Sequence, residues 1–232
     1  MTHLSLPNRI IIFFFIILLS VLIVFITKLG IADIHAHQSY RTLKAWQLSP
    51  FDMSDNEWDE IQHNLERARE FDPENPELLM ASGLAYEGRF AYDAVQYPQA
   101  REDREKALAY YRQSVKLRPS WPYGWIDLAL VKYRLGELNQ EFYDALAISA
   151  ELGPWEPGVQ RVIIDIGLHG WDHINDDAHT LVIDTIKKAV IHSNRQHVNS
   201  IISLLKKYNT LYYACLSADD DPYLTNICKG QR

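Results

Sequence analysis

Histidine and aspartate residues gather in one short stretch of the sequence, where they could bind a metal ion. His169 and His173 are four residues apart, and residues at this spacing share one face of an α-helix. The stretch holds four further candidate ligands, Asp172, Asp176, Asp177 and His179. Gly167 and Gly170 disfavour a regular helix, and no HExxH pattern adds a general base. We therefore interpret the stretch as a polar turn with a helix cap, and we expect no metal and no cofactor.

Adjacent carboxylates occur at Asp59-Glu60 and at Glu102-Asp103. A glycosidase needs two carboxyl groups at a fixed separation, and nothing in the sequence fixes one. The chain also lacks a Gly-rich phosphate loop, a G-x-S-x-G nucleophile motif and a kinase signature. We expect a protein that is not an enzyme and keep an enzyme acting on glycans as the last alternative.

The chain has 2 cysteines, Cys215 and Cys228. The segment between them contains the turn-forming run DDDP, so outside the cytoplasm a disulfide is the simplest interpretation. In the loop-entropy model such a bond would stabilise the tail by about 3 kcal/mol. Two free thiols and a zinc site are the alternatives.

The charge balance excludes one class of partner. The formal net charge is -7 at pH 7, from 23 Lys and Arg against 30 Asp and Glu. Such a surface repels nucleic acid, and no stripe of basic residues offsets the repulsion. The hydrophobic fraction of 47% is enough for a sizeable core, which disfavours a disordered chain.

The N-terminal segment is apolar enough to enter a membrane. Residues 10–26 read IIIFFFIILLSVLIVFI, and Ser20 is their only polar residue. As a helix this run covers roughly 26 Å, and flanking Leu residues can extend it to the roughly 30 Å of a bilayer core. We expect a retained membrane anchor. A cleaved signal peptide is the alternative, with a small-x-small site at residues 30–32.

Flanking charges and the cysteine pair give opposite predictions for the orientation of this anchor. Arg9 precedes the span, whereas Lys28, Arg41 and Lys44 follow it, which favours a cytoplasmic domain by the positive-inside rule. Long domains can cross a membrane despite modest flanking charge, and the cysteine pair favours an oxidising compartment. We expect a single-pass protein of the inner (cytoplasmic) membrane with a periplasmic domain.

Helix start and stop signals divide the rest of the chain. Ser54 and Glu57 form a capping-box pattern, and a helix from there should stop before Pro73. Pro76 opens the next helix. Further helices are expected at residues 107–116, 158–166, 177–192, 196–208 and 210–216.

Small, apolar and Pro residues recur between these signals in three successive groups. The first is Ile61, Leu65, Ala68 and Pro73; the second is Leu79, Gly83, Tyr86, Ala107, Tyr111, Ser114 and Pro119; the third is Trp125, Leu128, Ala129, Phe142, Leu146, Ser149 and Pro154. This spacing resembles the tetratricopeptide repeat, a pair of antiparallel helices that stacks into an array. Lys132 and Phe142 depart from its pattern, and an irregular helical bundle is the alternative.

The order of parts adds a second resemblance. An N-terminal span precedes degenerate repeats, the run LGPWEPGVQ at residues 152–160, and a late Cys beside Tyr212 and Tyr213. This is similar to the single-pass tetratricopeptide proteins of bacterial exopolysaccharide biosynthesis clusters (VpsP-like). The resemblance implies an accessory role in making or exporting a surface polysaccharide.

The expected fold is therefore all-α, a short irregular array of TPR-like helices. Residues 1–29 form the anchor and 30–53 a juxtamembrane linker. Residues 54–156 form the repeats, with an insertion at about 88–103, and 157–232 form a C-terminal helical cap and tail. Capping helices close the open end of such an array, as solubility requires.

The repeat phase also predicts a groove for a partner peptide. Eight residues fall on the first-helix face that lines the concave side of such arrays: Glu77, Met80, Glu87, Tyr123, Ile126, Leu130, Tyr133 and Arg134. Ordinary surface packing is the alternative. We expect a scaffold that binds membrane or periplasmic proteins of a polysaccharide assembly machinery. A periplasmic chaperone-like protein for envelope or secreted proteins is the alternative function.

Overall fold

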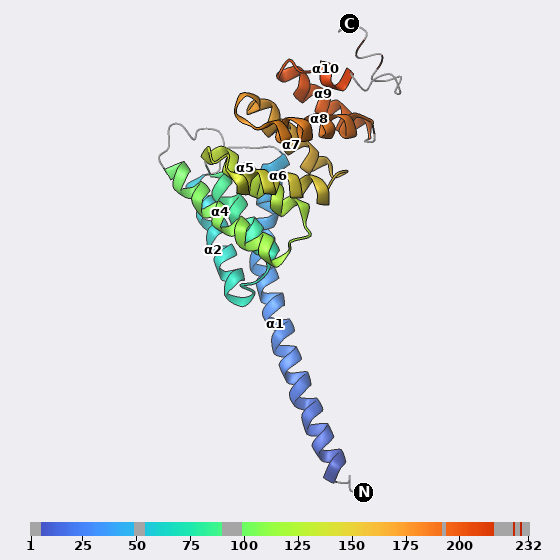
Figure 1. The fold of residues 1–232 in the computed structure, drawn as a ribbon. Helices are drawn as coiled ribbons and strands as arrows, with labels where there is room; N and C mark the ends of the chain where they lie inside the picture. The colour runs from blue at the N-terminus through green and yellow to red at the C-terminus, as the bar shows by residue number, and fades with distance from the viewer. Residues whose placement is uncertain are drawn as a thin grey trace. The chain divides into compact units, whose positions relative to one another are not determined.

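The computed structural model describes residues 6–48, 54–89, 99–191 and 194–215, together with residues 225 and 228. Every regular element in these ranges is helical and none is a strand, which confirms the all-α class. The chain divides into two compact units, unit 1 (Met1–Arg89) and unit 2 (Phe90–Arg232). Figure 1 shows their helices in sequence colours.

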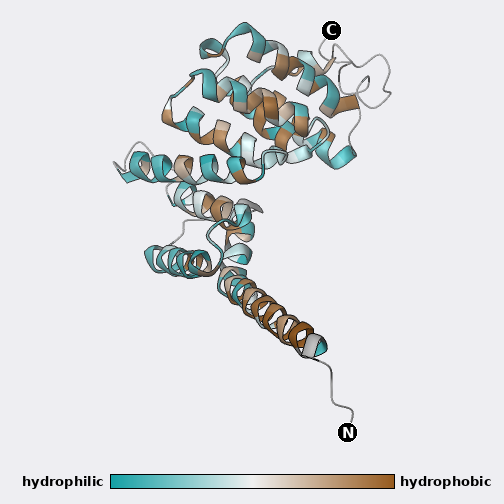
Figure 2. Ribbon diagram, turned by 60° about the horizontal axis from the view of Figure 1, so that its bottom comes forward, coloured by the Kyte–Doolittle hydropathy of each residue, from teal (hydrophilic) through white to brown (hydrophobic). Residues whose placement is uncertain are grey.

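Helix α1 (Leu6–Leu48) is continuous, but its two halves have opposite surroundings. Residues 10–26 are exposed along their whole length, and Figure 2 shows this half as the hydrophobic part of α1. In the described part of the chain, one helix is long and apolar enough to cross a membrane, within Ile10–Trp46. The second half of α1 instead packs against helices α2 (Asp55–Phe71) and α3 (Pro76–Gly88).

The linker expected at residues 30–53 is helical as far as Leu48, because α1 continues to that residue. Ala32, Ala36 and Leu43 recur on one face of α1 and are buried in the core of unit 1. Their spacing of four and seven residues keeps that face turned toward α2 and α3. One Gly at position 30 is not enough to end a helix that tertiary contacts hold.

Local capping fixes where the helices of unit 1 begin. Ser54 caps α2 in a complete capping box with Glu57, as the sequence predicts. Asn75 accepts hydrogen bonds from the first backbone N–H groups of α3, and Pro76 occupies its first turn. Each cap satisfies donors that would otherwise lack a partner at a helix start.

The first helix of unit 2 is α4 (Gln99–Leu117), so residues 99–103 of the insertion expected at about 88–103 are helical. Residues 90–98 lie outside the described ranges. The remaining elements are α5 (Pro122–Leu135), α6 (Gln140–Leu152), α7 (Pro157–His169), the short helix η1 (Trp171–His173), α8 (Asp176–Ile191), α9 (Arg195–Lys207) and α10 (Tyr212–Cys215).

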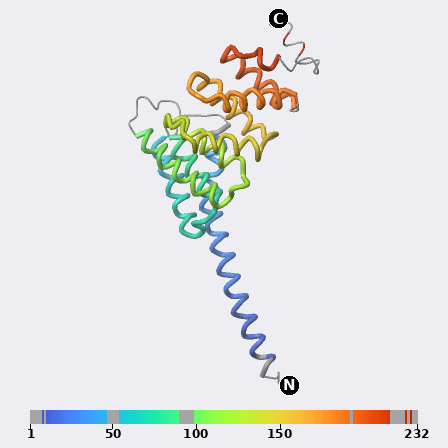
Figure 3. Tube along the Cα trace, in the orientation of Figure 1, coloured from blue at the N-terminus to red at the C-terminus, as the bar shows by residue number. Residues whose placement is uncertain are grey.

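Most helices of unit 2 pack against the next helix in the sequence and also against the next but one. The sequential pairs run from α4 with α5 to α8 with α9. The pairs α5 with α7, α6 with α8, and α7 with α9 add contacts between alternate helices. Figure 3 shows the trace passing through these helices in order. Each helix therefore buries its apolar face against neighbours that are close in the sequence.

Two glycines explain local features of unit 2. Gly136 ends α5 with a φ of 76°, a left-handed conformation that glycine adopts without strain. Gly167 was expected to break the helical spacing, but it lies inside α7. A Cβ atom at Gly167 would collide with Val182 of α8, so its missing side chain lets the two helices approach closely.

The C-terminal end of unit 2 contains a covalent link. Cys215 at the end of α10 and Cys228 form a disulfide, with Cα atoms 5.7 Å apart. Cys228 is buried, and the bond joins it to the last residue of α10.

Candidate functional site

The predicted groove residues of unit 1 do not form an open surface. Glu77 is exposed, whereas Met80 and Glu87 are buried. Helix α3 has apolar residues on most of its faces and packs with both α1 and α2. The assignment of Met80 and Glu87 to a groove is therefore wrong, because the repeat phase treats a largely enclosed helix as a lining helix.

Two of the five predicted groove residues of unit 2, Tyr123 and Tyr133, contact the ends of α7. Ile126 is 1% exposed and belongs to the core, so its assignment to the groove is also wrong. Tyr123 donates a hydrogen bond from Oη to Glu156 Oε2 at 2.9 Å, and its ring lies against Gly158 at the start of α7. Burial and the nearby carboxylate raise the pKa of Tyr123 to about 12.

Tyr133 makes the matching contact at the other end of α7. Its ring lies against Gly170, and the ring centroids of Tyr133 and His169 are 5.9 Å apart. Leu130 between the tyrosines is half-buried, and Arg134 is exposed. The eight predicted residues are thus divided between the two units, and the two tyrosines of α5 contact a helix of the same unit.

Two of the three histidines considered as metal ligands, His169 and His179, pack against aromatic rings, and His173 is exposed. His169 lies between Tyr133 and Tyr208, with a centroid distance of 6.1 Å to the second ring. The His179 and Trp171 ring centroids are 4.2 Å apart, and His179 Nε2 is 2.8 Å from the Trp171 carbonyl oxygen. Across the described residues, no three His, Cys, Asp or Glu side chains come together as metal ligands would.

A groove that the sequence did not reveal lies between α6 and α8 of unit 2. Its volume is about 310 Å³, and it is lined by Gln140, Tyr143, Asp144, Leu146, Ala147, Asn175, Asp177, Ala178 and Leu181. Leu146 and Ala178 are buried and form an apolar floor, with Leu181 half-buried beside them. We refer to this surface as the α6–α8 groove.

The rim of the α6–α8 groove is acidic. Asp144 and Asp177 are both exposed, and no Lys or Arg is among the described residues that line the groove. Asp144 Oδ1 accepts a hydrogen bond from Gln140 Nε2 at 2.8 Å, which leaves its second oxygen available. Tyr143 adds a half-buried aromatic ring. The groove thus combines apolar contact, an aromatic face and negative charge.

Two asparagine caps position the helices that form the groove. Asn139 accepts a hydrogen bond from the Phe142 N–H at the start of α6. Asn175 does the same for Ala178 at the start of α8, with an oxygen–nitrogen distance of 2.9 Å. The sequence shows both asparagines as helix starts. It does not show that α6 and α8 pack together, because their contacting residues are more than 30 positions apart.

An ionic network around one buried lysine joins α4, α5 and α6. The Lys132 side chain is fully buried, and its Nζ donates to Glu137 Oε2 at 2.9 Å and to Glu141 Oε2 at 2.8 Å. Arg112 of α4 makes a two-point contact with the Glu141 carboxylate, at 2.7 and 2.6 Å. The hydrogen bonds from Arg112, with those from Lys132, lower the pKa of Glu141 to about 2.

No protein-family model matches the chain, and no curated protein matches it. The α6–α8 groove brings together exposed side chains that do not take part in packing α5 on α7.

Proposed function

We propose that the protein is a non-enzymatic, membrane-anchored scaffold that binds partner proteins of a bacterial surface-polysaccharide assembly machinery. The α6–α8 groove is the observation that carries the binding role, because it is hollow, apolar at its floor and acidic at its rim. Helix α1, long and apolar enough to cross a membrane, supports the anchoring role. The polysaccharide setting rests on the resemblance of the sequence to such accessory proteins.

The chemistry of the groove selects a polypeptide segment that presents Arg or Lys beside an apolar side chain. The cation would lie near Asp144 and Asp177 and over the Tyr143 ring, while the apolar side chain would contact Leu146 and Leu181. A volume of about 310 Å³ suits one or two anchoring side chains. Affinity would come from these anchors rather than from a large interface.

The arrangement of unit 2 supports a repeat-like scaffold. Contacts between alternate helices, as in α5 with α7 and α6 with α8, are those that a stacked array of helix pairs requires. The disulfide between Cys215 and Cys228 favours an oxidising compartment. We therefore propose that unit 2 lies on the periplasmic side of the inner membrane.

The proposal is tested with the full-length chain in its native membrane. A photo-crosslinking amino acid replaces Ala147, which lines the groove and is exposed. Mass spectrometry then identifies the crosslinked segment of the partner. We expect a segment with Arg or Lys next to an apolar residue, in a protein of polysaccharide assembly or export. Capture of mainly secreted or outer-membrane proteins would instead indicate the chaperone-like function.

Reversing the acidic charges of the groove tests whether they bind the partner, and a matched control reverses acidic charges outside the groove. The double variant Asp144→Lys/Asp177→Lys should reduce crosslinking at least about tenfold, since it replaces attraction by repulsion. The control Glu151→Lys/Asp184→Lys makes the same change in net charge at exposed positions of α6 and α8 outside the groove. Equal crosslinking by both double variants, or a crosslinked segment without a basic residue, would contradict the proposed site.

A further inference from the structure

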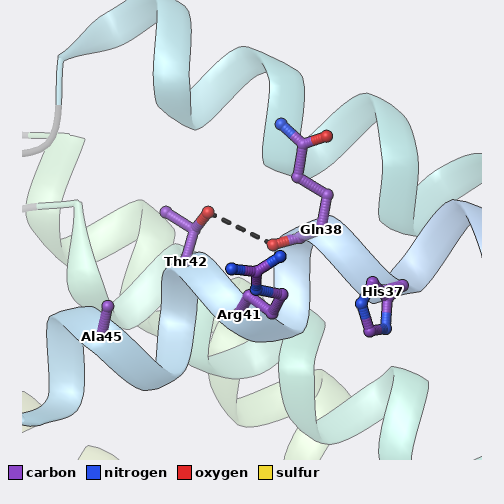
Figure 4. A pocket seen from close by; sticks show the side chains of 5 residues that line it. All are labelled: His37, Gln38, Arg41, Thr42 and Ala45. Atoms are coloured by element: carbon purple, nitrogen blue, oxygen red, sulfur yellow. Dashed lines mark hydrogen bonds between the residues drawn. The ribbon is translucent and has the colours of Figure 1, made fainter.

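The half of α1 that packs in unit 1 has one exposed face with basic character. A hollow of about 490 Å³ on this face is lined by His37, Gln38, Arg41, Thr42 and Ala45. Figure 4 shows that all five side chains come from α1 and that Thr42 Oγ1 donates to the Gln38 carbonyl oxygen, at 3.2 Å. His37 and Arg41 are four residues apart and exposed, so both present donors on the same face.

An acidic hollow lies directly beside the basic one. It has a volume of about 140 Å³ and shares Gln38 and Thr42 with the first hollow. Its lining from α2 includes the exposed carboxylates of Glu57 and Glu60. Gln38 Nε2 donates to Glu60 Oε1 at 2.7 Å, so Gln38 forms the boundary between the two hollows.

In the described part of unit 1, the charged side chains of the two hollows do not form ion pairs with each other. In the described part of unit 1, no salt bridge involves Arg41, His37 or Glu60. The Glu57 carboxylate bonds to Ser54, which holds its position without neutralising its charge. Adjacent patches of opposite sign form a surface that is complementary to itself.

The register of α1 and α2 places the two patches at the same level along α1. The helices are antiparallel, as three contacts show: His35 with Phe71, Gln38 with Glu60, and Ser39 with Ile61. Arg41 lies three residues after Gln38 on α1, and Glu57 lies three residues before Glu60 on α2. Because the helices are antiparallel, Arg41 and Glu57 lie at the same level. Copies anchored in one bilayer through α1 share a common height, so the basic patch of one copy faces the acidic patch of another.

We propose that unit 1 forms a two-fold symmetric dimer in the plane of the membrane. His37 and Arg41 of each copy contact Glu57 and Glu60 of the second copy. The symmetry axis runs along the membrane normal and passes near Gln38, because Gln38 separates the two hollows. Such an interface buries the same patch on both copies and closes without forming a filament.

Cysteine crosslinking of the full-length chain in zwitterionic liposomes tests the position of the axis. The variant Gln38→Cys places a thiol next to its own counterpart, and the native cysteines are already joined as a disulfide. A short bismaleimide should then give a covalent dimer in high yield. The control Glu66→Cys, at an exposed position of α2 outside both hollows, should give at least about fivefold less. Equal yields at both positions would overturn the proposed axis.

Charge reversal tests the contacts themselves. Arg41→Glu and Glu60→Arg should each weaken dimerisation about tenfold, measured by single-molecule counting in the same liposomes. The double variant restores opposite charges across the axis and should return to within about twofold of the unmodified chain. Lys188→Glu, at an exposed position of α8, is the control for net charge and should have no effect.

Two outcomes would overturn the proposal. Failure of the double variant to restore dimerisation would remove the charge pairing. Dimerisation that requires anionic lipid would show that the basic face of α1 binds headgroups instead of a second copy. Raised salt should weaken the dimer, because exposed charge pairs are screened within about 10 Å at 0.1 M ionic strength.

Discussion

The two units use charge in opposite ways. In unit 2, Lys132 is fully buried and bonds to two carboxylates, one of which also receives Arg112. In unit 1, Arg41 and Glu60 are exposed, and no ion pair joins either of them to another described residue. A buried charge has to be paired inside the chain, because burial without a partner costs several kcal/mol. Exposed complementary charges carry no such cost and remain available to a partner.

The largest expected effect comes from removing the buried lysine of the ionic network. Lys132→Ala removes the cation between Glu137 and Glu141 and leaves a cavity along the buried stem of Lys132. We expect the free energy of unfolding of the full-length chain in detergent to fall by roughly 3 to 4 kcal/mol. Denaturant titration measures this loss.

Companion variants sharpen this result. Lys188→Ala removes an exposed Lys from α8 and should cost less than about 0.5 kcal/mol. The triple variant Lys132→Met/Glu137→Gln/Glu141→Gln removes the buried cation together with both carboxylates that it contacts. It should recover most of the lost stability, since Arg112, which loses Glu141 as its partner, is 44% exposed and is solvated by water. A triple variant as unstable as Lys132→Ala would mean that packing, not charge, sets the cost.

The disulfide is the second stabilising feature of unit 2. The double variant Cys215→Ser/Cys228→Ser opens a link between residues 13 positions apart. We expect a loss of about 2 to 3 kcal/mol, because the unfolded chain gains conformational freedom. Thermal unfolding with and without reductant measures it: reductant should lower the melting temperature of the unmodified chain and leave the variant unchanged. An unmodified chain that is insensitive to strong reductant would contradict a stabilising bond.

Helix boundaries could be predicted from the sequence because their causes are local. Ser54 with Glu57, and Pro76 at the start of α3, carry their own stereochemical reasons for a helix start. The continuation of α1 to Leu48 could not be predicted this way. It depends on Ala32 and its neighbours meeting α2 and α3, which is a tertiary contact.

Burial within the helices was harder to predict than their boundaries. The repeat phase predicts that Met80, Glu87 and Ile126 line a groove, yet all three are buried. Tyr123 and Tyr133 are of a residue type that is common at binding surfaces, but their rings lie against Gly158 and Gly170 at the two ends of α7. The sequence does not predict the α6–α8 groove. Its floor is formed by Leu146 of α6 and Ala178 of α8, and no motif links these two distant residues.

The pH dependence of stability gives a smaller effect within the same network. Hydrogen bonds, first from Arg112, lower the folded-state pKa of Glu141 to about 2, below the ordinary value of 4.5. The carboxylate therefore contributes stability above about pH 4.5, and this contribution is lost as the pH falls toward 2. With the side chain 39% exposed, solvent screening reduces the contribution to about 1 to 2 kcal/mol.

The variant Glu141→Gln isolates this contribution. Its difference in unfolding free energy from the unmodified chain should be largest near pH 6 and should shrink between pH 5 and pH 3. Glu105→Gln, which removes an exposed pair with Arg101 on α4, is the control and should show a difference below about 0.5 kcal/mol at every pH. A constant difference for Glu141→Gln across this range would contradict the lowered pKa.

The smallest expected effect on stability concerns the exposed charges of unit 1. Arg41→Gln and Glu60→Gln remove one charge each from surfaces that have no ion-pair partner in the described part of the chain. At a protein concentration where the chain is monomeric, each should change the free energy of unfolding by less than about 0.5 kcal/mol, or about 1 to 2 °C in melting temperature. The same variants should weaken dimerisation in liposomes, since the lost charge acts between copies. A loss of stability above about 1 kcal/mol in the monomer would mean that Arg41 already has a partner within its own chain. Unit 1 would then pair this charge internally, as unit 2 pairs Lys132, and the difference between the units would not hold for Arg41.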